Sequence, residues 1–409
     1  MTKRILHITP SLPNTFYGGG ALTSYGIVIS FLKKGYKVNI LTWDNMDEES
    51  KKRAIAELDK LGVDIIILKQ QFGKGGIWRY WKRIFFPCIG DMFPHFYSQD
   101  KVKKLLRGSK YNAVVAYHWE GLAATAGINS LPKIGLVGDP VDLPYIYRRV
   151  FRKYLGDTKI NFSDIKNFFK QRYQRKFMKL LLQECKVCGA FAFHHAQMFR
   201  KWGLHHLRYF RTPIIDLFDN TKKFSLSSKS KILLIGHMKG IATLSGLFLF
   251  ATQVFPILKR ELGENNFEVH LIGDFFDVLP QKIKESLSYP QIKIRGRVVP
   301  ISSEMVNADL LLVPTCINLG IRVRILTAFS FGTPVVAHLI NKNGIPELEH
   351  NRNALLSNTG EGLAKEVIRL LRDKRLQEKL REMGRKTYQD YFSIEKAGAE
   401  IVRVVEEST

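Results

Sequence analysis

The sequence has few residues that could form covalent or metal cross-links. Its 409 residues include only four cysteines, and these contain a single CxxC pair, Cys185 and Cys188, with no second pair at zinc-ligand spacing. A structural zinc site is therefore not expected, and the cysteines are predicted to be buried free thiols in a reducing cytosol. With 15 Pro and 31 Gly the composition also excludes collagen-like and disordered chains.

Long apolar runs are missing as well. No stretch approaches the roughly 18 uninterrupted apolar residues of a membrane span, and the segment from Met1 to Ile8 has no small-residue cleavage site of a secretory leader. From these two absences we expect a protein that is soluble or bound to a membrane surface, in the cytoplasm as the cysteines indicate.

Acidic residues are scarce relative to basic ones, with 37 Asp and Glu against 63 Lys and Arg, a net charge of +26. Such an excess predicts an anionic partner. Residues 69–110 carry ten basic and two acidic side chains, and residues 148–182 carry eleven and two, so most of the excess lies in two segments.

The first of these segments also contains aromatic residues, among them Trp78, Trp81, Phe85 and Phe86. Aromatic rings mixed with Lys and Arg favour an anionic membrane surface. Stacking on single-stranded nucleic acid, or ordinary packing beneath solvated charges, are the alternatives; no nucleic-acid partner is expected.

Short apolar runs alternate with amphipathic stretches along the whole chain, which is typical of βα units that form a parallel sheet. The series restarts after Pro213, so we expect an α/β fold of two doubly wound, Rossmann-like domains facing across a cleft. A polar linker is expected at 220–230. The expected strands are 4–9, 37–42, 63–68, 113–117, 133–137, 231–235, 268–272, 292–295, 310–313 and 333–337.

Glycines follow the first expected strand of each half. Gly18, Gly19 and Gly20 directly precede a predicted helix, where bare amides could hold an anion or a sugar. Their spacing is not that of the dinucleotide motif GxGxxG, and a plain tight turn is the alternative. In the second half, Gly236 leads into His237 and Lys239, and the lysine could pair with a diphosphate.

The most informative stretch runs from Pro314 to Val336. A loop should turn at Gly320 and a helix should follow to Phe331, where Gly332 stops it. The amides of Gly320, Ile321 and Arg322 would then open that helix, and Arg322 or Arg324 could add charge to the same phosphate. Alternatively, both arginines merely coat a helix face.

These features together resemble the retaining glycosyltransferases of family 4, which have the GT-B fold. The likeness extends from the first glycine loop through the bridge at 210–216 and the 320–336 region to the tail Tyr391-Phe392-Ser393. It implies an N-terminal acceptor domain, 1–215, that faces the membrane, a nucleotide-sugar domain, 216–389, and a C-terminal helix, 390–409, that crosses back.

The resemblance also implies a set of donor-binding residues. Leu319 and Thr327 stand where the family usually has two glutamates, so two carboxylate contacts to the donor are replaced. No acidic pair is placed for a divalent ion, so neither a metal nor another cofactor is expected. The donor-binding residues are predicted to be Gly18, Gly19, Gly20, His237, Lys239, Arg297, Leu319, Gly320, Ile321, Arg322, Arg324 and Thr327.

Two residues of the first half are predicted to take part in catalysis. His118 and Asp139 each follow an apolar strand, so their side chains should emerge at the carboxyl edge of the sheet. A strand-end histidine and a turn-forming aspartate are the alternatives. The adjacent pairs His194–His195 and His205–His206 are not expected to bind metal, because neighbouring helical residues face different ways.

The sequence therefore predicts a metal-independent glycosyltransferase that moves a sugar from a nucleotide-sugar to a glycan or lipid-linked acceptor of the cell envelope. Retention of anomeric configuration follows from the resemblance. Its place would be peripheral, on the inner face of the cytoplasmic membrane. An inactive homologue that acts as a partner or regulator, a nucleic-acid binder and a nucleotide-sugar epimerase are the other hypotheses.

Overall fold

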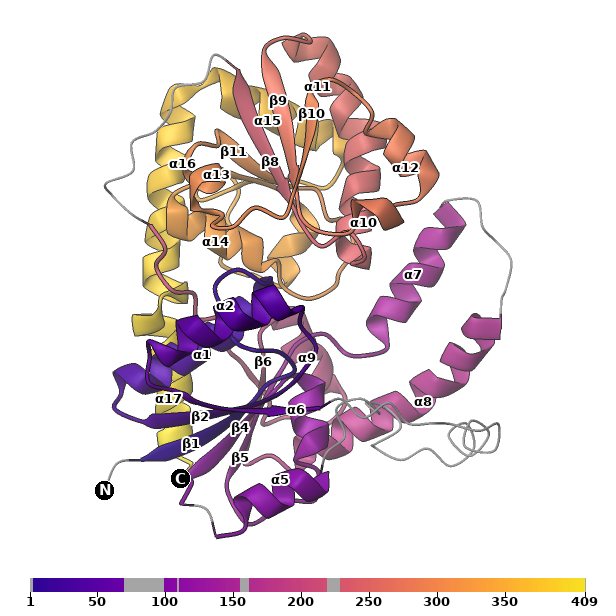
Figure 1. Cartoon of the computed structure of the whole chain (residues 1–409). Coiled ribbons are helices and arrows are strands. Elements are labelled where there is room, and N and C mark those ends of the chain that lie inside the picture. Colours follow the sequence, from indigo (N-terminus) through magenta and orange to yellow (C-terminus); the bar gives the residue numbers. More distant parts are fainter. Residues whose placement is uncertain (1–2, 70–98, 109, 155–161, 219–228, 409) are drawn as a thin grey trace. The chain divides into compact units, whose positions relative to one another are not determined.

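The computed structural model describes residues 3–69, 99–108, 110–154, 162–218 and 229–408. The chain divides into two compact units (Figure 1). Unit 1 is Met1–Pro213 together with Ala397–Thr409, and unit 2 is Ile214–Lys396.

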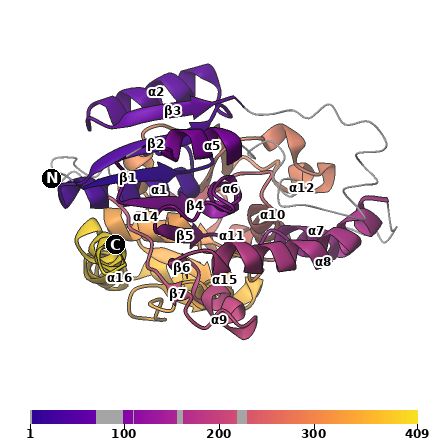
Figure 2. The same cartoon turned by 90° about the horizontal axis from the view of Figure 1, so that it is seen from below.

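Unit 1 is built on a parallel sheet with the strand order β3-β2-β1-β4-β5-β6-β7, which Figure 2 shows from one edge to the other. The central strands form because their apolar runs are buried on both faces, as is usual in parallel sheets; all five residues of β4 and of β5 are buried. The strands are β1 Arg4–Ile8, β2 Lys37–Trp43, β3 Asp64–Leu68, β4 Ala113–Tyr117, β5 Lys133–Val137, β6 Val187–Ala190 and β7 Arg208–Tyr209.

Helices cover this sheet, and their ends follow from local chemistry. The side chain of Asp47 caps α2 by accepting a hydrogen bond from the amide of Ser50 at 2.8 Å. The last helix, α17, returns to unit 1 and packs against α1. The helices are α1 Gly19–Lys33, α2 Glu48–Asp59, α5 Gln99–Leu106, α6 His118–Ala124, α7 Leu143–Tyr154, α8 Phe162–Gln183, α9 Phe193–Lys201 and α17 Ala399–Glu406.

Unit 2 repeats the same plan with the order β10-β9-β8-β11-β12-β13, again all parallel. Each unit therefore has the strand order of a doubly wound fold, which places loops that can bind ligands at the carboxyl edge of its sheet. The strands are β8 Ser230–Ile235, β9 Phe267–Ile272, β10 Ile292–Gly296, β11 Leu310–Val313, β12 Val335–His338 and β13 Leu355–Ser357.

The helices of unit 2 include a nearly continuous one, Ile241–Leu262, that is long and apolar enough to cross a membrane by length and composition alone. Of its most apolar window, 56% is buried within the protein, and Phe250 and Phe255 pack there as rings 5.7 Å apart. Core packing accounts for that apolar character. The helices are α10 Ile241–Leu249, η1 Phe250–Val254, α11 Phe255–Leu262, η2 Phe276–Val278, α12 Gln281–Ser286, α13 Ser302–Val306, α14 Val323–Phe331, η3 Leu339–Asn343, α15 Gly360–Arg372, α16 Lys374–Thr387, η4 Tyr388–Phe392 and η5 Ile394–Gly398.

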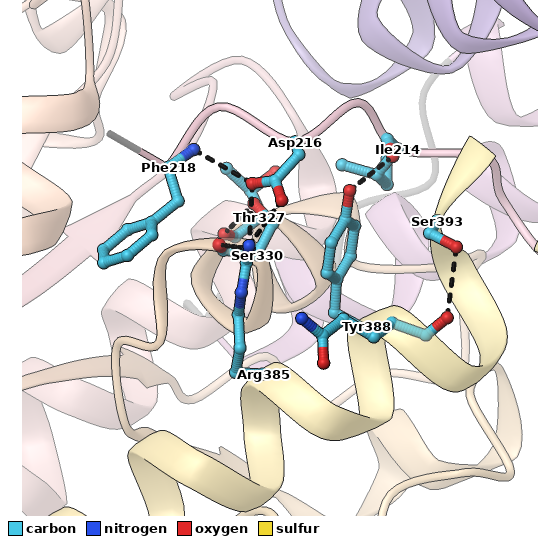
Figure 3. A network of polar contacts seen from close by, with 9 residues as sticks. Ile214, Asp216, Phe218, Thr327, Ser330, Arg385, Tyr388 and Ser393 are labelled. Carbon is cyan, nitrogen blue, oxygen red and sulfur yellow. Dashed lines mark hydrogen bonds and ion pairs between the residues drawn. The ribbon is translucent and has the colours of Figure 1, made fainter. Parts of the chain in front are cut away.

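A polar network fastens the first residues of unit 2 to its last helices (Figure 3). Ile214 pairs with Ser393, and its carbonyl accepts a hydrogen bond from the hydroxyl of Tyr388 at 3.1 Å. The guanidinium of Arg385 forms an ion pair with Asp216 and donates to the carbonyl of Ser330. The segment where the chain enters unit 2 is thereby held beside the segment where it leaves.

The two predicted doubly wound domains are confirmed, and the ten expected strands all exist. The sequence missed β6, β7 and β13, which have four, two and three residues. Most of the linker expected at 220–230 lies outside the described residues, and Ser230 already belongs to β8.

Candidate functional site

In unit 1 the loop after β1 carries the predicted glycines. Gly18 has φ 105°, a conformation that residues with a side chain rarely adopt. The buried Asn14 shapes the loop: its Nδ2 donates to the carbonyl of Leu12 at 2.7 Å, and its Oδ1 accepts from the amides of Phe16 and Tyr17 at 3.0 and 2.6 Å. The glycines are thus presented by a fixed loop at the start of α1.

His118 stands at the junction of β4 and α6, with an unusual φ of 58°. Its ring packs edge-on against Tyr117, and a methyl group placed on Gly138 would lie 2.3 Å from its Cε1, so this position leaves no room for a side chain. A methyl group on Gly20 would lie 3.8 Å from Nε2. The structure therefore brings the glycine loop and His118 together.

Burial controls the protonation of this histidine. It lowers the pKa of His118 to about 4, against the opposing field of the Asp139 carboxylate. At neutral pH the imidazole is uncharged, so it can accept a hydrogen bond from a hydroxyl group.

Asp139 follows β5, and its side chain remains 35% exposed. The main-chain carbonyl accepts from Nε1 of Trp119 at 2.6 Å, while Oδ1 lies 3.7 Å from Nδ1 of the buried His195. Sequence reasoning gave the pair His194–His195 no part in the site. The structure places His195 against Asp139, and the available signal was the position of the pair in the first turn of the helix that follows the short strand β6.

In unit 2 three loops meet at the carboxyl edge of the sheet, and each begins with a glycine at or just after the end of its strand. A methyl group on Gly273 would lie 1.8 Å from the carbonyl oxygen of Gly236, so the loops after β9 and β8 approach too closely for a side chain. The amide of Gly273 donates to Gly296 at 2.8 Å, and the amide of Met238 donates to Asp274 at 3.1 Å. Main-chain hydrogen bonds thus join all three loops.

Basic side chains lie on these loops. His237 and Lys239 are both exposed, and the ammonium of Lys239 lies 3.6 Å from the ring centroid of Phe275. Arg297 grips the carboxylate of Asp274 with two nitrogens, at distances of 2.8 to 3.1 Å. Partial desolvation of the imidazole lowers the pKa of His237, as do the charges of Lys239 and Arg297, while Asp274 opposes them.

The loop before α14 differs from the prediction in one respect. The helix begins at Val323 and not at Gly320, because Arg322 has a non-helical backbone with φ −93° and ψ 85°. Leu319 is buried, and its carbonyl accepts a hydrogen bond from the Arg322 guanidinium. Gly320 has φ 61° and Ile321 is partly exposed, so their amides precede the helix.

Arg324 and Thr327 turn toward the interior of the domain. The guanidinium of Arg324 donates to the carbonyl of Ile235 and to the hydroxyl of Thr315, the latter at 2.9 Å. Burial, with the nearby charge of Arg322, lowers its pKa to about 9. The hydroxyl of the buried Thr327 donates to the carbonyl of Val323 at 3.2 Å. Both side chains therefore brace α14.

Three further predictions concern the membrane residues, metal binding and the cysteines. Trp78, Trp81, Phe85 and Phe86, the residues predicted to meet a membrane, lie outside the described residues. Within the described ranges, no group of three or more His, Cys, Asp or Glu side chains is arranged to hold a metal ion. Cys185 and Cys188 are buried free thiols, as expected, and burial raises the pKa of Cys188 to about 12.

Comparison with known proteins identifies the second unit. Residues 229–373 match the family model described as glycosyl transferases group 1. The matched residues lie within unit 2 and make up most of it. This match confirms the predicted resemblance to glycosyltransferases and the enzyme class. A search of curated protein sequences found no match to the chain.

Solved structures similar to this chain match it over both units. The HepE protein of Anabaena, solved in complex with UDP and glucose, is 13% identical with a TM-score of 0.70, and the match covers 99% of this chain and 100% of that one. Sucrose-phosphate synthase from Thermosynechococcus elongatus is 12% identical at 0.69, with 99% and 98% covered. A glycosyltransferase from Rickettsia africae is 14% identical at 0.68, with 100% and 98% covered. The predicted GT-B fold is confirmed.

Proposed function

We propose that this glycosyltransferase moves a sugar from a nucleotide-sugar donor, held by unit 2, to an acceptor held by unit 1. The observation that carries the proposal is the gathering of cationic side chains and close-packed glycine loops at the carboxyl edge of a glycosyl transferase group 1 domain. Bare amides, Lys239 and Arg322 together suit a diphosphate. UDP in the solved HepE complex supports the same class of donor.

The proposed chemistry is a transfer with retention of configuration. The bond between the sugar and the leaving phosphate breaks, a bond forms between the same carbon and the acceptor oxygen, and the departing phosphate takes the acceptor proton. The neutral imidazole of His118 and the carboxylate of Asp139 would orient the acceptor hydroxyl and stabilise charge on the sugar. Cationic side chains would stabilise the leaving diphosphate, so the proposal needs no metal or other cofactor.

Two positions make donor recognition unusual. Leu319 is buried and Thr327 is bonded to its own helix, so neither offers the charge-assisted contact of a carboxylate. Each lost contact of that kind weakens binding by roughly 1–3 kcal/mol. These substitutions are also what favours the second hypothesis, a homologue without catalysis that acts as a partner or regulatory protein.

The donor assignment is tested by titrating UDP, GDP, ADP and CDP into the wild-type protein and two variants. We expect Lys239→Ala and Arg322→Ala each to weaken the binding of the preferred diphosphate by roughly 1–3 kcal/mol. Arg352→Ala is the control, because that guanidinium lies elsewhere in unit 2 and pairs with Glu349 at 2.7 Å. Unchanged affinity in both variants would remove the phosphate assignment. A protein with no bound nucleotide and no turnover of any donor sugar would support the inactive homologue.

We further propose a glycan or lipid-linked acceptor of the cell envelope, with the protein peripheral on the inner face of the cytoplasmic membrane, in polysaccharide biosynthesis. Support comes from the charge of residues 69–110 and 148–182. In the described part of the second segment, Val150, Ile165 and Phe168 are 44%, 49% and 65% exposed. Apolar side chains in water beside Lys and Arg suit an anionic bilayer.

A further inference from the structure

Phe275 of unit 2 has a backbone conformation that is unusual for a bulky residue. Phe275, in the loop after β9, has φ 66° and ψ 43°, the left-handed conformation that a bulky side chain seldom adopts. The residue is also 38% exposed. Since neither the backbone nor burial favours phenylalanine here, the contacts made by the ring must explain its presence.

The ring of Phe275 contacts two residues of the neighbouring loop. The Lys239 ammonium lies 3.6 Å from its centroid, well inside the range of a cation–π contact. The imidazole of His237 lies 4.8 Å away, measured between ring centroids. The two loops are fixed to each other by the hydrogen bond from the amide of Met238 to the carbonyl of Asp274.

The residue before Phe275 in the sequence is Asp274, whose carboxylate binds an arginine. Asp274 accepts three contacts from Arg297 within 3.1 Å. A π face, unlike a carboxylate, attracts an ammonium group without cancelling its charge.

We propose that Phe275 is a positioning residue for donor binding, which holds the Lys239 ammonium in place for the diphosphate of the nucleotide-sugar. The proposal rests on the proposed function, because Lys239 is there assigned to that diphosphate. A lysine side chain has four rotatable bonds and loses their freedom when its charge is fixed. A ring that already restricts those bonds lowers the entropy lost on binding.

The contact itself is tested by NMR, without any ligand. Lysine side chains are reductively dimethylated with ¹³C, which keeps their charge, and the Lys239 signal is assigned by its disappearance in Lys239→Arg. We expect this signal to be shifted upfield by the ring current of Phe275 and to return to the range of exposed lysines in Phe275→Leu. A Lys239 signal at the ordinary position in the wild-type protein would overturn the proposal.

The consequence for binding is tested with UDP, or with whichever of GDP, ADP and CDP the wild-type protein binds best. We expect Phe275→Leu to weaken binding about three- to tenfold and Phe275→Tyr to stay within about twofold. In the Lys239→Ala background, Phe275→Leu should have no further effect, because it acts through the lysine. Effects that add in full in the double variant would overturn the proposal.

Two further variants separate positioning from a merely structural role. Phe275→Gly should bind the nucleotide more weakly yet melt at the same or a higher temperature, since glycine accepts the left-handed backbone. Val278→Ala, in the same turn and 46% exposed, should leave binding unchanged. If Lys239→Ala weakens binding but Phe275→Leu does not, this inference fails alone. If no nucleoside diphosphate binds the wild-type protein, the proposed function fails and this role fails with it.

Discussion

His7 illustrates how one buried side chain makes stability depend on pH. It lies one residue before the end of β1, is fully buried, and its Nε2 is 2.7 Å from the hydroxyl of Ser24. Burial lowers its pKa to about 4, against a hydrogen bond with the backbone of Val115 that raises it. The folded protein therefore keeps His7 neutral at a pH where the unfolded chain, with a histidine pKa near 6.5, would bind a proton.

We predict that His7 makes the protein less stable in acid. Its stabilising contribution is complete above about pH 6.5 and is lost as the pH falls toward 4, by an amount of up to about 3 kcal/mol. Thermal unfolding midpoints at pH 7.5 and pH 5 measure the effect, and His7→Leu should lose less stability between the two values than the wild-type protein. His205→Gln, at an exposed position, should behave as the wild type. An equal acid loss in His7→Leu would contradict the prediction.

Residues of the candidate site were predictable from sequence where their position follows from one strand. His118 and Asp139 each come directly after an apolar run, so their place at the carboxyl edge needs no knowledge of tertiary structure. The contact between Asp139 and His195 depends on the pairing of β5 with β6, where Val137 lies opposite Ala190. Such a register joins residues far apart in the sequence, and no local pattern encodes it.

At the scale of elements, helix α1 packs closely against Pro213, the last residue of the first segment of unit 1. A methyl group placed on Gly26, in the middle of this helix, would lie 2.1 Å from the carbonyl oxygen of Pro213. Glycine usually weakens a helix by roughly 0.5–1 kcal/mol relative to alanine. Here the absent side chain lets the backbone of residue 213 approach the helix.

We predict that Gly26→Ala lowers the free energy of unfolding by roughly 1–3 kcal/mol, opposite in sign to the propensity effect, because an added methyl overpacks the contact. Urea unfolding followed by circular dichroism measures the change. The matched control is Gly20→Ala in the same helix, where the methyl would meet atoms only at 3.8 Å or beyond, so stability should stay the same or rise. A Gly26→Ala variant as stable as that control would show that residue 213 can move away.

Elements were predictable in proportion to their length and burial. The long central strands of both sheets read as apolar runs because both faces are covered, whereas the two residues of β7 carry no pattern at all. The start of α14 was placed three residues early because the loop 320–322 contains no residue that rules out a helix. Its non-helical backbone accompanies the tertiary contact between Arg322 and the carbonyl of Leu319.

At the scale of the whole molecule, the charge is unevenly distributed. A net charge of +26 would favour any anion if it were spread evenly, but residues 69–110 and 148–182 hold 17 of these charges. Each Lys or Arg near an anionic membrane surface contributes about 1 kcal/mol, and each buried CH₂ group adds about 0.8 kcal/mol. Exposed apolar side chains in the second segment, such as Ile165 and Phe168, would add the second contribution to the first, so binding to a membrane would use both.

We predict that the protein sediments with vesicles of phosphatidylglycerol and phosphatidylcholine but not with phosphatidylcholine alone, and that salt weakens the association. Trp78→Ala with Trp81→Ala, or Ile165→Ser with Phe168→Ser, should lower the partition coefficient about three- to tenfold, because apolar contact with the bilayer is lost. Tyr391→Ser in unit 2, at a residue 41% exposed, is the control and should have no effect. Nucleotide affinity should be unchanged in all of these variants. If the variants and the wild-type protein sediment equally, these side chains do not contact the membrane. If the protein binds single-stranded RNA but not vesicles at the same salt concentration, its anionic partner is a nucleic acid and not a membrane.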